Sequence, residues 1–489
     1  MAEAVVSSFD QQVQSLDFRT VFNKQLQHQF VLARTDAEER VEKLQRLHDT
    51  IMQHRDEIAQ ALWQDLHKSP TEMVVTEIGF VCGEIRHTIE RLRTWMAPKR
   101  VSTPLITFGA DSEIRYEPRG VCLILSPWNF PFNLTLAPLV SAVAAGNCVI
   151  VKPSEHAPAS AAMIKKMVEA CFPPEEVCLF EGDASLAQAL LELPFHHVFF
   201  TGSPQIGKSV MQAAAKNLSS VTLELGGKSP VLIDESADLE VAAAKIAWVK
   251  CMNMGQLCTA PDYVLVPEHL HDRLVENIIR YIKQYYGETL EARRASPDLC
   301  RLIHERHFDR VGALLDDAVQ HGATVAHGGK YFREEKYIDP AVLTHVPDSA
   351  AIWEEEIFGP LLPVRTYKTL DEAIAYINSK PKPLALYAFS LKNKTTEYIL
   401  RETRSGGVTI NDCSTHFYNL ELPFGGANNS GIGRCHGEFG FMEFSHARAV
   451  LRQARVPLLP KTRRPWWFLK TPRAGISFLL ARQAARGSA

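Results

Sequence analysis

The sequence contains no Cys-x-x-Cys pair and no regular cysteine spacing, although it has 10 cysteines among 489 residues. They are scattered from Cys82 to Cys435. Structural zinc sites and disulfide frameworks both require paired or regularly spaced cysteines. We therefore predict no metal site, and free thiols of the kind found in the reducing cytoplasm.

A secretory signal and a strong net charge are lacking as well. Glu3 and Asp10 interrupt the N-terminus, which has no apolar signal core. A net charge of -3 argues against general binding of nucleic acids. Residues 121–151 carry no charge and are long enough to cross a bilayer. Prolines and Gly146 divide this stretch at intervals typical of strand, turn, helix and strand, so we predict no membrane span there.

The chain is too long for one hydrophobic core. From Val121 onward, short apolar strands alternate with helical segments, which predicts a parallel sheet covered on both faces. The predicted strands are 121–125, 147–151, 177–180 and 197–200, with helices 133–145, 157–171, 184–191 and 204–216. A second such series follows residue 226, with helices 238–252, 268–285, 304–320 and 371–379 and strands 263–266 and 362–366. The sequence therefore predicts an α/β protein with two sheets.

Two long helices are predicted before the first sheet. Thr35 and Glu38 have the spacing of a capping box at the start of one helix. Ser69 and Pro70 are typical of the start of the second, which should stop at Ala97, before a proline. Residues 1–30 are predicted to be a helical or loose extension. Residues 101–118 alternate around a turn at 109–111 and predict a β-hairpin.

The C-terminal region, residues 453–489, differs in composition from the rest. Its last 34 residues hold seven Lys or Arg and no acid, with the aromatic cluster Pro465–Leu469. Basic residues with interfacial aromatics suit a membrane surface. Peripheral membrane contact through residues 457–489 and a packing arm or disordered tail remain alternatives.

Cys258 follows a predicted amphipathic helix that ends at Gly255, so it lies on a loop. A cysteine among Met252, Met254 and Leu257 is usually a small buried hydrophobic residue. A thiol with a pKa of about 8.5 is mostly unionised at neutral pH. Local sequence alone therefore favours a structural role over a nucleophile.

Four motifs change that interpretation. Together, and in matching order, they resemble the motifs of the NAD(P)-dependent aldehyde dehydrogenases. The resemblance covers residues from about 35 to 450. The four motifs are Ser126-Pro-Trp-Asn-Phe-Pro131, Val221-Thr-Leu-Glu-Leu-Gly-Gly-Lys228, Gly255-Gln-Leu-Cys258 and Glu355-Glu-Ile-Phe-Gly-Pro360. With Pro423-Phe-Gly-Gly426 and Ser430-Gly-Ile-Gly433, the chain is most similar to the class 3 branch, which includes fatty-aldehyde dehydrogenases.

The resemblance implies a division into domains. Residues 1–100 and 119–226 would form a Rossmann-like NAD(P)-binding domain with N-terminal helices, and residues 227–412 a second α/β catalytic domain. Residues 101–118 and 413–452 would form a β oligomerisation arm, which implies a homodimer. The basic tail follows at 453–489.

The resemblance also implies a mechanism. Cys258 would attack the aldehyde carbonyl, while its own amide and Asn129 stabilise the oxyanion. After hydride transfer, Glu224 would activate water to hydrolyse the thioester. By periodicity alone, Glu224 lies opposite Val221 on its strand and would be an outward, solvated residue. Only the resemblance makes it the base.

The cofactor residues are likewise implied by the resemblance. Lys152 and Glu155 would contact the adenosine ribose, and a carboxylate there favours NAD over NADP, although class 3 members often accept both. Glu356 would bind the nicotinamide ribose, with Phe358 against the ring. The residues Gly202, Ser203 and Gly207 would lie by the phosphates, although a plain helix cap explains Ser203 equally well.

Three other functions were weighed. A coenzyme A-acylating enzyme would not need Glu224 as a hydrolytic base. A non-catalytic binding protein would not need Cys258, Asn129 and Glu224 together. A cysteine hydrolase lacks a convincing histidine partner, since His196 and His197 open a predicted core strand.

Overall fold

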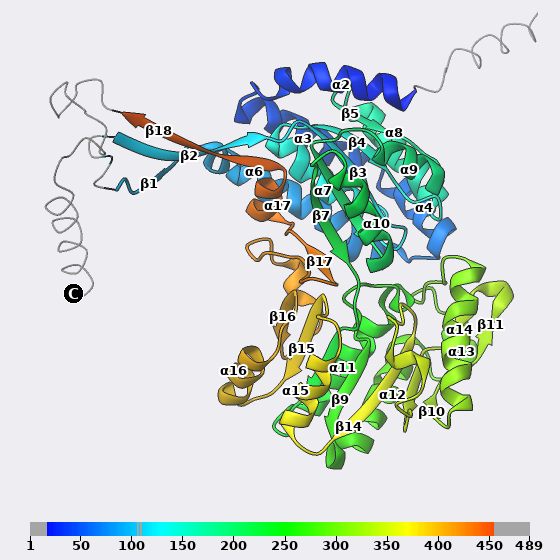
Figure 1. Cartoon of the computed structure of the whole chain (residues 1–489). Coiled ribbons are helices and arrows are strands. Elements are labelled where there is room, and N and C mark those ends of the chain that lie inside the picture. The colour runs from blue at the N-terminus through cyan, green and yellow to red at the C-terminus, as the bar shows by residue number, and fades with distance from the viewer. Residues whose placement is uncertain (1–16, 105–106, 108–109, 454–489) are drawn as a thin grey trace, which may run out of the picture. The chain divides into compact units, whose positions relative to one another are not determined.

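The computed structural model describes residues 17–104, 107 and 110–453, which divide into two compact units (Figure 1). The first unit comprises the chain up to Ala97 and residues 116–446, and the second comprises residues 98–115 and 447 onward. All residues proposed for the active site belong to the first unit.

The N-terminal region is helical, with two corrections to the prediction. Of the two alternatives for the N-terminal extension, the helical one is found, as helix α2 (Phe18–Leu32). The capping box lies one residue later than predicted. The backbone N–H of Glu39 donates to Asp36, whose own N–H donates to the Glu39 carboxylate. The first predicted helix is two, α3 (Ala37–Gln53) and α4 (Arg55–Leu66).

The second predicted helix contains a π-helical turn. It begins as expected, with Ser69 capping α5 (Pro70–Met73), continues as η1 (Val74–Ile78), and ends in α6 (Gly79–Met96). A Cβ at Gly79 would lie 2.1 Å from the Val74 carbonyl oxygen, so the wide turn requires glycine at this position. π-Helical turns often occur near functional sites.

The first sheet confirms the predicted alternation. It has six strands in the order β17-β7-β6-β3-β4-β5, and all neighbours are parallel except the β17-β7 pair. Its strands are β3 (Val121–Leu125), β4 (Cys148–Lys152), β5 (Val177–Leu179), β6 (His197–Gly202), β7 (Ser220–Leu225) and β17 (Gly431–Ile432). The intervening helices are α7 (Asn133–Ala145), α8 (Pro158–Cys171), α9 (Ala184–Leu191) and α10 (Pro204–Ala215).

The uncharged stretch 121–151 is thus β3, α7 and most of β4, and its strand residues are buried in the sheet. Among the helices of the described residues, none has both the length and the apolarity needed to span a bilayer.

The second sheet has seven strands in the order β10-β13-β14-β9-β8-β15-β16, parallel except at β10. Its strands are β8 (Pro230–Ile233), β9 (Tyr263–Pro267), β10 (Thr324–His327), β13 (Ala341–Thr344), β14 (Leu361–Tyr367), β15 (Ala385–Phe389) and β16 (Gly407–Ile410). The helices around it are α11 (Leu239–Cys251), α12 (His271–Tyr286), α13 (Leu290–Ala295), α14 (Glu305–Gln320), α15 (Leu370–Ser379) and α16 (Asn393–Glu402). The predicted second series of alternating strands and helices is therefore confirmed.

The second unit contains a three-stranded sheet of order β1-β2-β18. Strands β1 (Lys99–Val101) and β2 (Ala110–Pro118) pair antiparallel, with Lys99 opposite Ile114. The predicted antiparallel pairing is present, but the turn predicted at 109–111 is wrong, since β2 already includes Ala110 and Asp111. The third strand is β18 (Ser445–Gln453). Residues 454–489 lie outside the described residues, and with them the predicted membrane contact.

Residues 413–446, predicted to belong to the arm, pack in the first unit instead. Helix α17 (Gly437–Glu443) lies against α6 and α7, and the ring of Phe444 stacks on Phe199 at 5.7 Å. These large apolar side chains are fully buried there, which explains why this segment joins the main core.

Candidate active site

The first sheet brings several predicted residues to one edge. Parallel strands end at the same edge, and residues at or after the ends of β3, β6 and β7 meet there. A cavity of about 580 Å³ lies at this edge, bounded also by loops that flank the second sheet. The predicted residues that line it are Asn129, Gly202, Ser203, Glu224, Cys258, Glu356 and Phe358.

Cys258 follows α11 and a sharp turn, η3 (Met252–Gly255). Asn253 and Met254 both have positive φ, 46° and 55°, a backbone conformation uncommon outside glycine. Hydrogen bonds hold the turn: the Asn253 amide donates to the Asn129 carbonyl at 2.8 Å, and its backbone N–H donates to Glu72 at 2.8 Å. Residues with such backbone strain cluster at functional sites, where surrounding contacts maintain it.

The Cys258 side chain is half-buried, and its thiol is strongly perturbed. Burial raises the pKa of the thiol to about 12, and the negative charges of Glu356 and Glu224 raise it further. The backbone N–H groups of Cys258 and Thr259 act in the opposite direction, because they stabilise negative charge at the sulfur. The resting thiol is therefore protonated.

Asn129 is buried and held from both ends. Its side-chain amide donates to the Gln256 carbonyl at 3.0 Å, and its backbone carbonyl accepts from Lys68 at 3.1 Å. A primary amide has two N–H donors, so one remains for a ligand in the cavity. A free N–H of this kind is what an oxyanion-hole donor needs.

Lys68 and Glu77, which the sequence analysis did not single out, fix the loop that carries Asn129. Their side chains are fully buried and form an ion pair at 2.6 Å. The other Glu77 oxygen accepts from the backbone N–H groups of Phe132 and Asn133, at 3.1 and 2.9 Å. In the sequence, the only sign of this ion pair is that a charged residue, Glu77, lies next to the apolar positions of the second predicted helix.

Glu224 lies on β7 and is 6% exposed. Neither carboxylate oxygen has a conventional hydrogen-bond partner. Burial raises the pKa of Glu224 well above its usual value, and Arg434 and the Cys435 thiol only partly offset this. The periodicity expectation of a solvated residue is wrong because the segments on either side of β17, the strand that pairs with β7, bring Phe424 and Cys435 into the pocket that Glu224 lines.

Glu356 lies against the Gly226–Gly227 backbone. Its carboxylate accepts from the Gly227 N–H, and a Cβ at Gly226 would lie 2.0 Å from Glu356 Oε2. Burial, with the charge of Asp262, raises the pKa of Glu356 to about 8. Glycine at position 226 thus lets this carboxylate reach the cavity.

Phe358 completes the same wall. Its ring meets Trp128 edge to face at 5.5 Å, and its carbonyl accepts from His307 Nε2 at 2.8 Å. His307 and Arg310 also line the cavity and were not predicted. Their only sequence signal is a position early in a predicted amphipathic helix, which is too general to identify a site.

The remaining predicted residues do not line this cavity. Lys152, at the end of β4, pairs with Glu155 at 2.6 Å. Gly207 has a packing role, since a Cβ there would lie 2.7 Å from the Leu225 side chain. Ser203, by contrast, lines the cavity and caps α10 by accepting from the Ile206 N–H at 3.4 Å, which agrees with the helix-cap interpretation.

All 10 cysteines are free thiols. In the described ranges, no group of three or more His, Cys, Asp or Glu side chains is placed to hold a metal ion.

Comparison with known proteins identifies the family. The model of the aldehyde dehydrogenase family matches residues 5–450. The chain belongs to the aldehyde dehydrogenase family. Aldehyde dehydrogenase family 3 member B1 of Homo sapiens is 41% identical over 467 residues, which cover 94% of this chain and 97% of the relative. The predicted resemblance to class 3 is therefore confirmed.

Two further relatives of this aldehyde dehydrogenase bear on the cofactor. The Mus musculus protein named aldehyde dehydrogenase, dimeric NADP-preferring, is 41% identical over 435 residues, covering 89% of this chain and 94% of the relative. The NAD+ complex of an aldehyde dehydrogenase from Bacillus cereus matches with a TM-score of 0.81 at 28% identity, covering 89% of both chains.

Proposed function

We propose that this aldehyde dehydrogenase oxidises apolar aldehydes, aliphatic or aromatic, to carboxylic acids through a covalent intermediate on Cys258, with NAD as cofactor and NADP also accepted. The observation that carries the proposal is the meeting of Cys258, Glu224 and Asn129 at one cavity of about 580 Å³. These side chains come from three separate elements, and together they supply a nucleophile, a base and an oxyanion donor.

The residues around the cavity fit a dinucleotide. The N-terminus of α10 lines it with Gly202, Ser203 and Pro204, and helix N-termini bind phosphate through free backbone N–H groups. Lys208 and Arg310 add positive charge on the same walls. Glu356 is placed to accept from ribose hydroxyls. When bound, the oxidised nicotinamide supplies a hydride acceptor and a positive charge.

For the adenosine ribose we propose Lys152 and Glu155, which are paired at the end of β4. A carboxylate at this position disfavours a 2'-phosphate. Because Glu155 pairs with Lys152, a positive group lies beside the carboxylate, and this would reduce its repulsion of a 2'-phosphate. This arrangement supports a preference for NAD with tolerance of NADP.

In the first half of the reaction, the Cys258 sulfur attacks the aldehyde carbon, and the carbonyl oxygen becomes an oxyanion. The free N–H of Asn129 and the Cys258 backbone N–H donate to it, and one such donor contributes about 3 to 4 kcal/mol. The thiol proton passes to Glu224, directly or through water, and Glu224 releases it to bulk water before the second half, so that its carboxylate is free to act again. Loss of hydride from the carbon leaves a thioester on Cys258.

In the second half, water attacks the thioester carbon while Glu224 accepts the water proton. The carbon–sulfur bond breaks, Cys258 leaves as a thiolate, and the acid is released. Burial makes Glu224 a stronger base than a solvated carboxylate, because its deprotonated form is poorly stabilised. This property suits proton removal from water.

The apolar substrate is proposed from the walls next to Cys258. A second pocket that shares Cys258 has few polar surfaces. Its side chains include Phe130, Leu134, Met252, Leu257, Phe417 and Tyr418. Such a wall favours an alkyl or aryl chain, since each buried CH₂ contributes about 0.8 kcal/mol.

We also propose a homodimer formed through the β1-β2-β18 sheet. All residues of β1 are exposed, and β18 is a nine-residue strand at the other edge. Unpaired strand edges readily pair with another chain. Location in the cytoplasm and membrane contact through 457–489 remain proposals from composition.

The test of the function is the Cys258→Ala variant. Formation of NADH from octanal or benzaldehyde should fall to background, because no other side chain supplies the sulfur, while NAD binding measured by calorimetry persists. Aldehyde oxidation at the wild-type rate in this variant would contradict the proposal. Acyl-coenzyme A formation by the wild type would favour the acylating alternative instead.

A further inference from the structure

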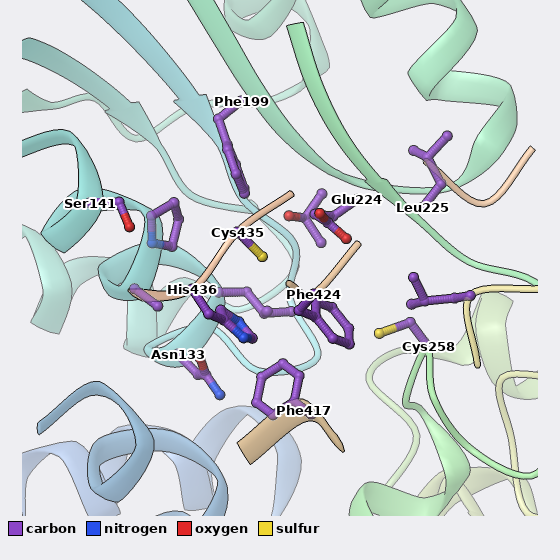
Figure 2. A pocket seen from close by; sticks show the side chains of 15 residues that line it. Asn133, Ser141, Phe199, Glu224, Leu225, Cys258, Phe417, Phe424, Cys435 and His436 are labelled. Atoms are coloured by element: carbon purple, nitrogen blue, oxygen red, sulfur yellow. The ribbon is translucent and has the colours of Figure 1, made fainter. Parts of the chain in front are cut away.

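A small chamber adjoins the active site on the side of Glu224. It offers about 30 Å³ to the centre of a water-sized sphere and is walled mainly by apolar side chains. Figure 2 shows Glu224, Cys258, Cys435 and His436 around this pocket. A water molecule needs about 10 to 15 Å³ by this measure, so the chamber has room for about two.

Three buried side chains place unpartnered polar atoms on the chamber wall. They are Glu224 with both oxygens, Asn133 with Oδ1 and His436 with Nδ1, and their exposed fractions are 6%, 2% and 5%. The Asn133 amide already donates to the Thr76 carbonyl at 2.7 Å, so its oxygen is the free end. Buried polar atoms without partners are costly. Bridging water is the usual way in which they are satisfied.

The His436 ring is held in one orientation. It stacks on Phe424 at 5.0 Å and 13°, and it contacts Phe417 and Phe80 at 4.7 and 4.8 Å between ring centroids. A backbone hydrogen bond joins the ring to Phe417. Because Nδ1 has no partner, we assign that bond and the ring proton to Nε2.

The surroundings keep His436 neutral. Burial lowers its pKa to about 3, and the neighbouring His416 lowers it further. Neutral imidazole with its proton on Nε2 has a lone pair on Nδ1, which can only accept a hydrogen bond. When Glu224 is ionised, the three side chains present only acceptors to the chamber, and none of them can pair with another without a donor such as water between them.

We propose that His436, together with Asn133, is a positioning residue that holds water in this chamber against Glu224 for hydrolysis of the Cys258 thioester. The inference rests on the proposed role of Glu224 as the base. One water gives its proton to Glu224 as its oxygen bonds to the thioester carbon and the carbon–sulfur bond breaks. A second water donates to His436 Nδ1 and accepts from the first, so it fixes the direction of attack.

The competing use of the chamber is to hold the end of the substrate chain. Its volume is too small for more than a short alkyl end, and unpartnered oxygen and nitrogen atoms are poor neighbours for hydrocarbon. Water is therefore the better occupant on both size and polarity.

The test compares His436→Gln with His436→Asn. The glutamine amide falls near Nε2 and keeps the bond to Phe417 but provides no acceptor at Nδ1. The asparagine oxygen falls near Nδ1 and keeps the acceptor. Rapid-mixing measurements of NADH with octanal should show a burst of one equivalent per active site in His436→Gln, then turnover slowed about tenfold or more. In His436→Asn most of the steady rate should return.

His416→Phe is the matched control. His416 is a half-buried histidine of the same aromatic cluster, 5.8 Å from Phe424, but it does not line the chamber. Thioester decay, followed by intact-protein mass spectrometry after mixing with aldehyde and NAD, should remain near the wild-type rate in this variant.

Two results would overturn the inference. One is thioester decay at the wild-type rate in His436→Gln, and the other is an altered chain-length preference of that variant with unchanged decay, which would assign the chamber to substrate. Failure of the proposed function looks different: no thioester would form in the wild type or accumulate in Glu224→Gln.

Discussion

At the scale of single residues, the reacting groups hold their protons more tightly than in water. Burial raises the pKa values of both Cys258 and Glu224. Each negative charge in the cavity also makes it harder for a neighbouring group to ionise. A protonated thiol is a weak nucleophile. The free enzyme is therefore protected from adventitious thiol chemistry, and a positive charge in the cavity would activate it.

Glu356→Gln tests this electrostatic coupling. Because the carboxylate raises the pKa of the thiol, removing its charge should lower that pKa and increase the thiolate fraction. Glu356 has a pKa of about 8, so its charge is present above this pH and lost below it. Alkylation of Cys258 by iodoacetamide without cofactor should be several-fold faster than in the wild type at pH 9, with a smaller difference at pH 7.

Glu354→Gln is the control, since Glu354 is exposed and pairs with Lys380. Its alkylation rate should match the wild type at both pH values. Equal rates for Glu356→Gln and the wild type at pH 9 would contradict the coupling.

At the scale of elements, one buried ion pair connects the helical N-terminal region to the loop that carries Asn129. Lys68 precedes α5 and Glu77 lies in the π-helical turn η1, whereas their backbone partners belong to residues 129–133. Lys68 also lies 4.0 Å from the centre of the Phe130 ring. The helices before the sheet therefore hold in place the loop that carries Asn129, the proposed oxyanion-hole donor.

Lys68→Met should be strongly destabilising, because it leaves the Glu77 charge buried and unpaired. Breaking a buried pair in this way typically costs about 3 to 5 kcal/mol. Urea unfolding should show the loss, and adding Glu77→Gln should recover part of it. Lys216→Met breaks an exposed pair with Glu192 and should change the free energy of unfolding little. Equal effects of the two lysine changes would contradict this account.

At the scale of the whole molecule, the second unit offers a surface for self-association. The sheet β1-β2-β18 has two strand edges and exposes Val101 and Leu451, at 42% and 52%. Apolar side chains on an unpaired edge favour pairing with a second copy.

Leu451→Pro should therefore shift the homodimer toward monomer. Proline removes a backbone N–H donor and resists the middle of a paired strand. Light scattering coupled to size-exclusion chromatography should report about half the wild-type mass at micromolar concentration. Leu451→Thr, which keeps the donor, should remain dimeric. A wild-type mass for the proline variant would exclude this edge from the interface.

Much of the fold followed from local sequence. The strands and helices between 121 and 216 lie within a few residues of their predicted bounds, because alternating apolar strands and capped helices are encoded over short distances. The capping box was predicted one residue too early. The predicted first long helix is in fact two helices, which are separated at His54. Residues 413–446 were placed with the arm, since nothing local shows that Phe441 and Phe444 are buried against α7 and β6.

For the site, the sequence by itself determined the family, through motifs such as Gly255–Cys258 and Glu355–Pro360, and with it the chemistry expected of Cys258. Only the tertiary structure decided the environment of that chemistry. Glu224 is buried because the segment around β17, some 200 residues later, pairs with β7 and brings Phe424 and Cys435 beside it. Lys68, His307 and His436 reach the site from segments with no motif of their own. Burial and pKa depend on contacts between distant segments, and such contacts leave no periodic signal in a single sequence.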